Sequence, residues 1–207
     1  MKIGIIGAGH IGGTLAGLLA RAGHQVAVSN SRGPESLKLF VAEAGKNVRA
    51  MTAADAAAFG ELIILAVPWR KPEALPPPHL VAGKIVVDAM NPYGEGGTLL
   101  DLGDSTSSEE TARRLPGSRL VKAFNTIYYK HLQERGTSRE EERITIYVAG
   151  DDKEAKAVVK GLIEEIGFAP FDTGPLREGG RRQQPGSPIY NTPMTLERAR
   201  EIFNSTA

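Results

Sequence analysis

Three glycines close to the start of the chain stand in a G-x-G-x-x-G pattern, in the segment Gly7-Ala8-Gly9-His10-Ile11-Gly12. The pattern G-x-G-x-x-G is weak evidence alone, but here it follows the apolar segment 2–6 and opens a segment with helical apolar spacing. In that context Gly7 permits a tight turn, Gly9 lets the backbone approach a pyrophosphate, and Gly12 allows close contact between helix and strand. The segment therefore predicts a dinucleotide site at a helix N-terminus. The alternative is a plain tight turn whose glycines serve geometry only.

A second polar cluster follows residues 25–28, whose apolar character predicts the next strand. In NAD-binding proteins an Asp or Glu at this place holds the ribose 2′-hydroxyl. This chain has no acid there and offers instead Ser29, Asn30, Ser31 and Arg32. A guanidinium can make paired, charge-assisted bonds to a 2′-phosphate. The cluster favours NADP over NAD, unless Arg32 is a loop arginine that points to solvent.

Two turns that contain proline stand at the carboxyl ends of later predicted strands, Val67-Pro68-Trp69 and Ala89-Met90-Asn91-Pro92. Open α/β sheets bind their ligands at this edge. We therefore expect Val67, Pro68 and Asn91 to line the nicotinamide side of the crevice, with the Asn91 amide available to a carboxamide or ribose. The other interpretation is that both turns only end strands, a role that suits proline in any case.

No acid–base or metal constellation accompanies these segments. The histidines are scattered, without the i, i+4 spacing of a helical zinc pair, at His10, His24, His79 and His131. The chain contains no cysteine, which excludes disulfides, a thiol nucleophile and Cys-ligated metal. No Gly-x-Ser-x-Gly nucleophile elbow is present. The sequence therefore predicts no metal site and no catalytic side chain.

Strands and helices alternate along the chain and would position these residues. Strands are predicted at residues 2–6, 25–28, 48–51, 62–67, 84–89, 119–124, 144–149 and 168–171. Helices are predicted after the glycine turn as far as residue 22, and at 35–44, 55–59, 106–115, 153–166 and 196–203. Residues 133–143 would form a solvated loop or helix. Because parallel neighbours need crossover helices, this alternation predicts an α/β fold with a Rossmann-type, doubly wound, mostly parallel sheet.

Composition limits the remaining classes of protein. The 207 residues include 25 basic and 24 acidic side chains, and a net charge of +1 gives no field that would gather nucleic acid or an anionic membrane. The longest apolar run, residues 62–69, is far shorter than the ~20 residues of a membrane-spanning helix. Nothing ahead of the first strand resembles a signal peptide. We therefore expect a cytoplasmic protein whose partner is a small molecule, with no nucleic acid and no membrane.

Together these segments resemble the family of coenzyme F420-dependent NADP oxidoreductases, also called NADPH-dependent F420 reductases. The resemblance spans nearly the whole chain and is carried by residues 7–12, 30–32, 67–69, 122–127, 148–152 and 172–176. It implies an eight-stranded Rossmann-type sheet and a short C-terminal part that covers the deazaflavin. The reaction it implies is reversible hydride transfer between NADPH and the deazaflavin. Such transfer between stacked rings needs orientation and water exclusion more than catalytic side chains.

The resemblance also assigns residues to parts of the two cofactors. It implies that the pyrophosphate lies on Ala8, Gly9, His10 and Ile11, the 2′-phosphate on Ser31 and Arg32, the nicotinamide near Val67, and the junction of the cofactors at Asn125, Thr126 and Ile127. The sequence departs from the archaeal reductase pattern at Tyr128-Tyr129 and in the tail 177–185, both where the acceptor should bind. The acceptor could therefore be coenzyme F420, a similar flavin-like molecule or another small molecule.

We interpret residues 1–175 as an NADP-binding Rossmann domain and residues 176–207 as a C-terminal extension that covers the acceptor site without forming an independent domain. Arg177, Arg181 and Arg182 predict a loop that closes over an anionic acceptor, or a loop that is merely solvated. A homo-oligomer agrees with the resemblance, although no apolar stripe defines an interface. Two other functions stay open. One is an NADP(H)-sensing module without turnover, and the other is a dehydrogenase of hydroxy acids or imines, which would need a larger helical domain.

Overall fold

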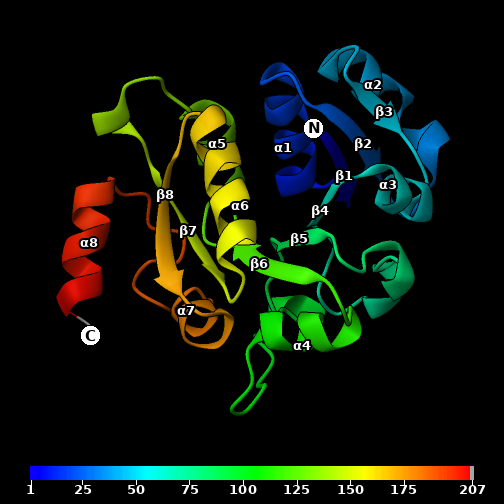
Figure 1. Cartoon of the computed structure of the whole chain (residues 1–207). Helices are drawn as coiled ribbons and strands as arrows, with labels where there is room; N and C mark the ends of the chain where they lie inside the picture. Colours follow the sequence, from blue (N-terminus) through cyan, green and yellow to red (C-terminus); the bar gives the residue numbers. More distant parts are fainter. Residues whose placement is uncertain (206–207) are drawn as a thin grey trace.

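An eight-stranded sheet forms the centre of the computed structural model, which describes residues 1–205 (Figure 1). Its strands are β1 (Lys2–Ile6), β2 (Gln25–Ser29), β3 (Val48–Ala50), β4 (Leu62–Leu65), β5 (Ile85–Asp88), β6 (Arg119–Ala123), β7 (Thr145–Gly150) and β8 (Ala169–Gly174). They lie in the order β3-β2-β1-β4-β5-β6-β7-β8, and all neighbours are parallel except β6 and β7. The predicted α/β fold with a Rossmann-type, mostly parallel sheet is confirmed.

Helices cover both faces of this sheet. They are α1 (His10–Arg21), α2 (Lys38–Ala44), α3 (Ala53–Phe59), α4 (Ser107–Arg114), α5 (Tyr129–Glu134), α6 (Lys153–Glu165), α7 (Leu176–Arg182) and α8 (Leu196–Ser205). α1, α2, α5 and α6 share one apolar core with the sheet, to which Leu15 and Val159 belong. α3, α4 and α7 lie over a second core on the opposite face, with Ala56 and Leu176. The strand order reverses between β1 and β4, where such sheets open a ligand crevice.

The central strands are apolar because both of their faces are covered. β4 reads LIIL and is buried throughout, as is usual for an interior strand of a parallel sheet. It ends at Leu65, earlier than predicted, so Val67 and Pro68 lie in the turn beyond it. The predicted helix 35–44 is divided into a 3-10 turn at Pro34–Leu37 and α2. Further 3-10 turns lie at Pro72–Ala74, Pro78–Leu80, Glu95–Gly97 and Glu140–Glu142.

The segment after β8 departs most from the sequence-based prediction. A Gly- and Arg-rich loop was expected there, but residues 176–182 form α7. Glycine within a helix costs about 1 kcal/mol relative to alanine, which is why propensity indicated a loop. A Cβ at Gly179 would lie 2.7 Å from Thr173 Oγ1 and 2.8 Å from the Ala149 Cβ. Close packing of α7 on β7 and β8 therefore requires this glycine, and tertiary contact overrides propensity.

The last helix lies beside β8 at the end of the sheet, where Figure 1 draws it in red. Ala199 of α8 is fully buried in a small third core with Tyr147 of β7 and Met194. The residues between α7 and α8 pass back over the carboxyl end of β6, where the Asn191 N–H donates to the Thr126 carbonyl at 2.8 Å. Among residues 1–205 no helix combines the length and apolarity that crossing a membrane would take.

Candidate functional site

The turn between β1 and α1 shows why glycine occupies each predicted position. Gly7 has a φ of +111°, and a Cβ there would lie 2.3 Å from the Ala66 carbonyl oxygen. A Cβ at Gly12 would lie 1.9 Å from the Gly7 carbonyl oxygen, so α1 can approach the turn this closely only with glycine. A Cβ at Gly9 would meet no atom within 4 Å. The open backbone at Gly9 is the surface on which a pyrophosphate could lie.

Gly9 is also the N-cap of α1, and as a glycine it supplies no side-chain acceptor to the first N–H groups of this helix. Uncapped N–H groups and the positive end of the helix dipole together favour an anion at this position. The residues on either side divide between two cavities. Ala8 and Gly9 line the larger cavity, whereas His10 and Ile11 line the smaller one.

The larger cavity is a cleft of about 730 Å³ that extends from the glycine turn across the ends of β2 and β4. A volume of roughly 300–1,000 Å³ is typical of small-molecule sites. Eight of the predicted site residues contribute to its wall: Gly7, Ala8, Gly9, Asn30, Ser31, Arg32, Val67 and Pro68. The structure thus brings the glycine turn, the polar cluster after β2 and the turn after β4 into one cleft.

The polar cluster after β2 is shaped by Asn30. Its Nδ2 donates to Ser36 Oγ at 2.8 Å, and its Oδ1 accepts from the Arg32 backbone N–H at 3.0 Å. The Asn30 amide therefore holds the loop, while Ser31 and Arg32 stay exposed at the rim of the cleft. Lys71 lines the same cleft and adds a second cation that sequence reasoning missed. These donors, with no acid directly after β2, suit the 2′-phosphate of NADP(H).

The smaller cavity, of about 190 Å³, lies over the carboxyl ends of β5 and β6. Five predicted site residues line it: His10, Ile11, Asn91, Asn125 and Ile127. Aromatic side chains complete its wall: Tyr128 and Tyr129, which the resemblance places where the acceptor should bind, and Phe124 and Tyr190, which were not expected as site residues. Phe124 has a φ of +63°, a left-handed conformation that is costly for a bulky residue and that concentrates at functional sites.

Asn91 and Asn125 bond to one another across this cavity. Asn91 Nδ2 donates to the Asn125 carbonyl oxygen at 2.8 Å, and Asn125 Nδ2 donates to Asn91 Oδ1 at 3.1 Å. Asn125 Nδ2 also donates to the Gln183 carbonyl oxygen at 2.7 Å. The Asn91 amide, expected to be available to a ligand, is therefore engaged in joining the ends of β5 and β6 to the C-terminal segment.

Tyr190 enters the cavity from that segment. Its hydroxyl lies 3.3 Å from Asn91 Nδ2 and accepts from the Tyr93 hydroxyl at 3.1 Å. Burial raises the pKa of Tyr190 well above its ordinary value. The phenol therefore stays neutral at physiological pH. Nothing in its local sequence indicated this position, because the contact joins residues 99 apart.

Two predicted residues lie outside both cavities. Gly12 contributes the close helix–turn contact described above. Thr126 is buried and faces a separate small cavity with Thr145 and Tyr147, and its carbonyl accepts from Asn191. Among residues 1–205 no group of three or more His, Asp or Glu side chains could hold a metal ion.

The expectation of an arginine-rich loop at residues 177–182 is wrong, because this segment forms α7. Arg177 pairs with Glu109 at 3.4 Å, and Arg181 donates to the Asp104 carbonyl at 2.5 Å. The Arg182 guanidinium lies 4.2 Å from the centroid of the Phe203 ring. Because these side chains project from α7, they attach it to its neighbours instead of forming a mobile lid.

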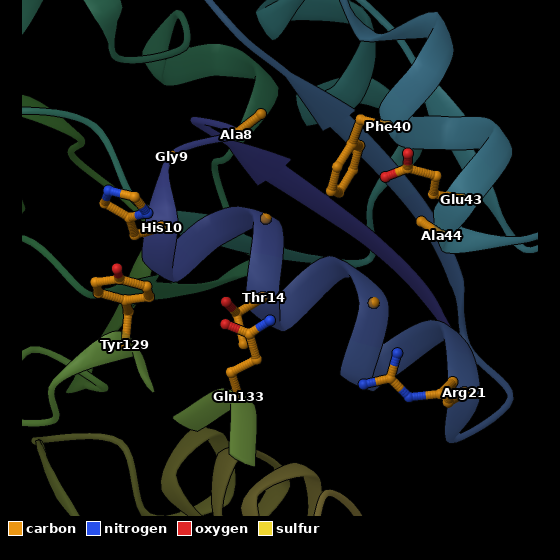
Figure 2. A pocket seen from close by; sticks show the side chains of 12 residues that line it. Ala8, Gly9, His10, Thr14, Arg21, Phe40, Glu43, Ala44, Tyr129 and Gln133 are labelled. Atoms are coloured by element: carbon orange, nitrogen blue, oxygen red, sulfur yellow. The ribbon is translucent and has the colours of Figure 1, made fainter. Parts of the chain in front are cut away.

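A shallow groove of about 550 Å³ follows the outer side of α1 (Figure 2). Figure 2 shows Phe40, Glu43 and Ala44 on one side of the helix and Tyr129 and Gln133 on the other. The groove shares Ala8, Gly9 and His10 with the predicted pyrophosphate surface and continues toward Arg21. It is therefore a solvent-facing continuation of the site along α1.

Comparison with known proteins agrees with this geometry. Residues 2–92 match the sequence model of a family described as NADP oxidoreductase, coenzyme F420-dependent. The chain is 31% identical over 178 residues to Metalloreductase STEAP3 of Rattus norvegicus, an alignment that covers 84% of this chain and 34% of that protein. It therefore spans about a third of the length of this curated relative.

Two crystal structures cover nearly the whole chain. The hypothetical protein SMa0349 from Sinorhizobium meliloti is 33% identical, with a TM-score of 0.83 over 94% of this chain and 95% of that one. A protein from Arthrobacter sp. FB24, proposed to be an F420-dependent NADP-reductase, is 26% identical, with a TM-score of 0.70 over 100% of this chain and 91% of that one. The chain is thus similar to coenzyme F420-dependent NADP oxidoreductases, in sequence over residues 2–92 and in structure over its whole length.

Proposed function

We propose that this protein transfers a hydride between NADPH and a deazaflavin such as coenzyme F420, or a similar flavin-like acceptor. The observation that carries the proposal is the junction of the two cavities at the start of α1. Ala8 and Gly9 line the larger cleft, and the next residue, His10, lines the smaller aromatic one. A dinucleotide that lay along this path would bring its nicotinamide toward the aromatic cavity, where an acceptor ring could meet it.

The residues of the larger cleft would hold the nucleotide. The uncapped N–H groups after Gly9 would bind the pyrophosphate, and Ser31 and Arg32 would bind the 2′-phosphate. Val67 and Pro68 would form the apolar wall beside the nicotinamide. Residues 1–175 would thus supply the nucleotide site, and the C-terminal extension, which the structure describes from residue 176 to residue 205, would close the acceptor side through Gln183 and Tyr190.

The residues of the smaller cavity would orient the acceptor and exclude water. When bound, NADPH supplies the hydride, so the protein needs no nucleophile of its own. Phe124 and Tyr190 offer flat apolar surfaces, and the Asn91–Asn125 pair fixes the strand ends between them. Holding reacting groups in this way can account for a large part of a rate enhancement.

The experiment is an anaerobic assay of NADPH oxidation with a panel of acceptors: F420, FMN, FAD and ferric chelates. We expect F420 to be reduced fastest, with a stoichiometry of one NADPH per F420. Arg32→Ala should raise the KM for NADPH without changing the order of the acceptors. If NADPH binds but no acceptor oxidises it, the protein is an NADP(H)-sensing module instead of an enzyme.

A second acceptor class is favoured by one observation, the 31% identity to a metalloreductase. On that basis a flavin would accept the hydride and pass single electrons to ferric iron. This candidate predicts that ferric chelates are reduced only when FAD or FMN is added. Reduction of F420 at a rate well above that of either flavin would exclude it.

A further inference from the structure

Two opposite charges lie side by side inside the sheet. Asp88 ends β5 and Lys122 lies in β6, and the parallel register pairs their Cα atoms directly. Lys122 Nζ lies 3.5 Å from Asp88 Oδ2, and the side chains are 1% and 0% exposed. Both strands are otherwise apolar at their buried positions, with the sequences IVVD and RLVKA.

Such a pair is a poor source of stability. Burial lowers the pKa of Lys122, and the negative charge of Asp88 only partly opposes this effect. Desolvation of two ions often costs as much as their attraction returns, so well-packed apolar residues can replace a buried pair without loss of stability.

Both side chains bind the backbone of one residue, Met90. Asp88 Oδ1 accepts from the Met90 N–H at 3.0 Å, and Lys122 Nζ donates to the Met90 carbonyl oxygen at 2.9 Å. Asp88 Oδ2 also accepts from Ser108 Oγ at 2.7 Å, in the first turn of α4. The positive end of that helix favours the carboxylate there. Met90 is thus fixed at both of its polar backbone groups.

Met90 directly precedes Asn91, and Lys122 lies two residues before Phe124 and three before Asn125. Asn91, Phe124 and Asn125 line the smaller cavity, and the two asparagines bond to one another. Asp88 and Lys122, by binding the backbone of Met90, therefore hold the end of β5 in place relative to the end of β6.

We infer that Asp88 and Lys122 are positioning residues that hold the Asn91–Asn125 pair where the nicotinamide meets the acceptor. The inference rests on the proposed function, because it takes the smaller cavity to be the place where the two rings meet. Neither charge is exposed to the cavity, so neither acts on a bound molecule directly.

The test compares two ligands that differ at the nicotinamide end. NADPH reaches both cavities, whereas adenosine 2′,5′-diphosphate carries only the adenosine and phosphate end. We expect Lys122→Met to weaken NADPH at least threefold and to leave the affinity for the diphosphate within a factor of two. The kcat should fall at least tenfold per folded molecule. Isothermal titration calorimetry and thermal unfolding would be measured on the same samples.

Two variants separate positioning from folding. In Asp88→Asn with Lys122→Met the buried charges are gone, so the melting temperature should recover relative to Lys122→Met. The carbonyl of Met90 still lacks its donor, so the loss of NADPH affinity should persist. Arg119→Met is the matched control, because Arg119 lies at the opposite end of β6 from the cavity and pairs there with Asp152, the N-cap of α6. Arg119→Met should lower the melting temperature and leave the affinities for NADPH and for adenosine 2′,5′-diphosphate unchanged.

The outcomes are distinct. If Lys122→Met lowers only the melting temperature, and the folded protein binds both ligands and turns over as the wild type does, the pair is merely structural and the inference is wrong. If Lys122→Met does not fold, the double variant gives the same readout. If the wild type reduces no acceptor, but Lys122→Met still weakens NADPH and not the diphosphate, the proposed function fails and the positioning role stands.

Discussion

The imidazole of His10 lies nearly parallel to the ring of Tyr129, with the ring centroids 4.1 Å apart and an interplanar angle of 16° (Figure 2). His10 is the first residue of α1 and Tyr129 the first of α5. The stack therefore packs the start of α1, which carries the predicted pyrophosphate surface, against the start of α5. It also gives His10 a packing contact.

Replacing His10 should test that role. An aromatic pair contributes about 0.5–1.5 kcal/mol beyond its buried area. His10→Ala and Tyr129→Ala should each weaken NADPH binding by roughly two- to tenfold, since α1 loses this support. His10→Phe keeps a stacked ring and should bind as the wild type does in calorimetric titrations. An equal loss in His10→Phe and His10→Ala would mean that the imidazole itself contacts the phosphates.

Arg32 should determine the choice of cofactor. The cluster after β2 has no acid, and Arg32 is exposed at the rim of the cleft. We expect NADPH to bind at least tenfold more tightly than NADH, about 1.4 kcal/mol, and Arg32→Ala to remove most of that difference. Lys38→Ala is the control, because Lys38 is a nearby cation that pairs with Glu35 outside the cleft wall. Equal affinities of the wild type for both nucleotides in fluorescence titrations would refute the cofactor assignment.

Three glycines of α1 and its turn should respond differently to alanine. Gly12→Ala would place a Cβ 1.9 Å from the Gly7 carbonyl and should destabilise the fold severely. Gly9→Ala meets no atom within 4 Å, so it should fold normally and weaken only NADPH binding. Gly17→Ala contacts only the flexible end of Arg21, at 3.3 Å, and should be neutral or stabilising by up to about 1 kcal/mol. Thermal unfolding and NADPH titration of the three variants measure both effects. Normal NADPH binding by Gly9→Ala would move the pyrophosphate away from this turn.

Tyr147 should make the fold sensitive to alkali. Its hydroxyl is buried without a hydrogen-bond partner among residues 1–205, and burial raises the pKa of Tyr147 to about 12. The unfolded chain releases this proton near pH 10, while the folded protein still retains it. The contribution to stability is therefore complete below pH 10 and is lost as the pH rises to 12, by at most about 1.4 kcal/mol per unit. Urea unfolding at pH 9 and 11 should show a smaller loss for Tyr147→Phe than for the wild type, and equal losses would contradict the assignment.

Local requirements made the nucleotide half of the site predictable from sequence. Gly7 and Gly12 are fixed by contacts within a few residues of the turn and with the neighbouring strand end, and Arg32 follows directly from the end of β2. The alternation of strands and helices likewise predicted the eight strands of residues 1–205 and the mostly parallel sheet, although not the order of the strands. The antiparallel step between β6 and β7 has no comparable local signal.

The acceptor half depends on long-range contacts that no local pattern encodes. Asn125 meets Gln183 across 58 residues, and Tyr190 meets Asn91 across 99. The glycines of α7 suggested a loop because their packing against β7 and β8 was not visible in the sequence. Asp88 and Lys122 did carry a signal, an acidic residue at the end of one apolar strand and a lysine between apolar residues of the next. Only the register, which pairs the two residues, shows that the charges meet.

The chemical step should not depend on any single ionisable side chain. The ionisable groups closest to the acceptor cavity are His10, Tyr128, Tyr129 and Tyr190 in its wall, with His131 in edge contact with Tyr128. None of these groups is needed to move a proton if a hydride passes directly between two bound rings. Loss of a general acid or base typically costs about 100-fold or more. We therefore expect His131→Ala, Tyr128→Phe and Tyr190→Phe each to lower kcat by less than this factor in stopped-flow assays with NADPH and F420.

Tyr190→Phe keeps the aromatic wall and removes only the hydroxyl, so it separates proton transfer from packing. A collapse of kcat in that variant, with NADPH affinity unchanged, would show that the Tyr190 phenol donates a proton to the acceptor and that the reaction is a coupled hydride and proton transfer.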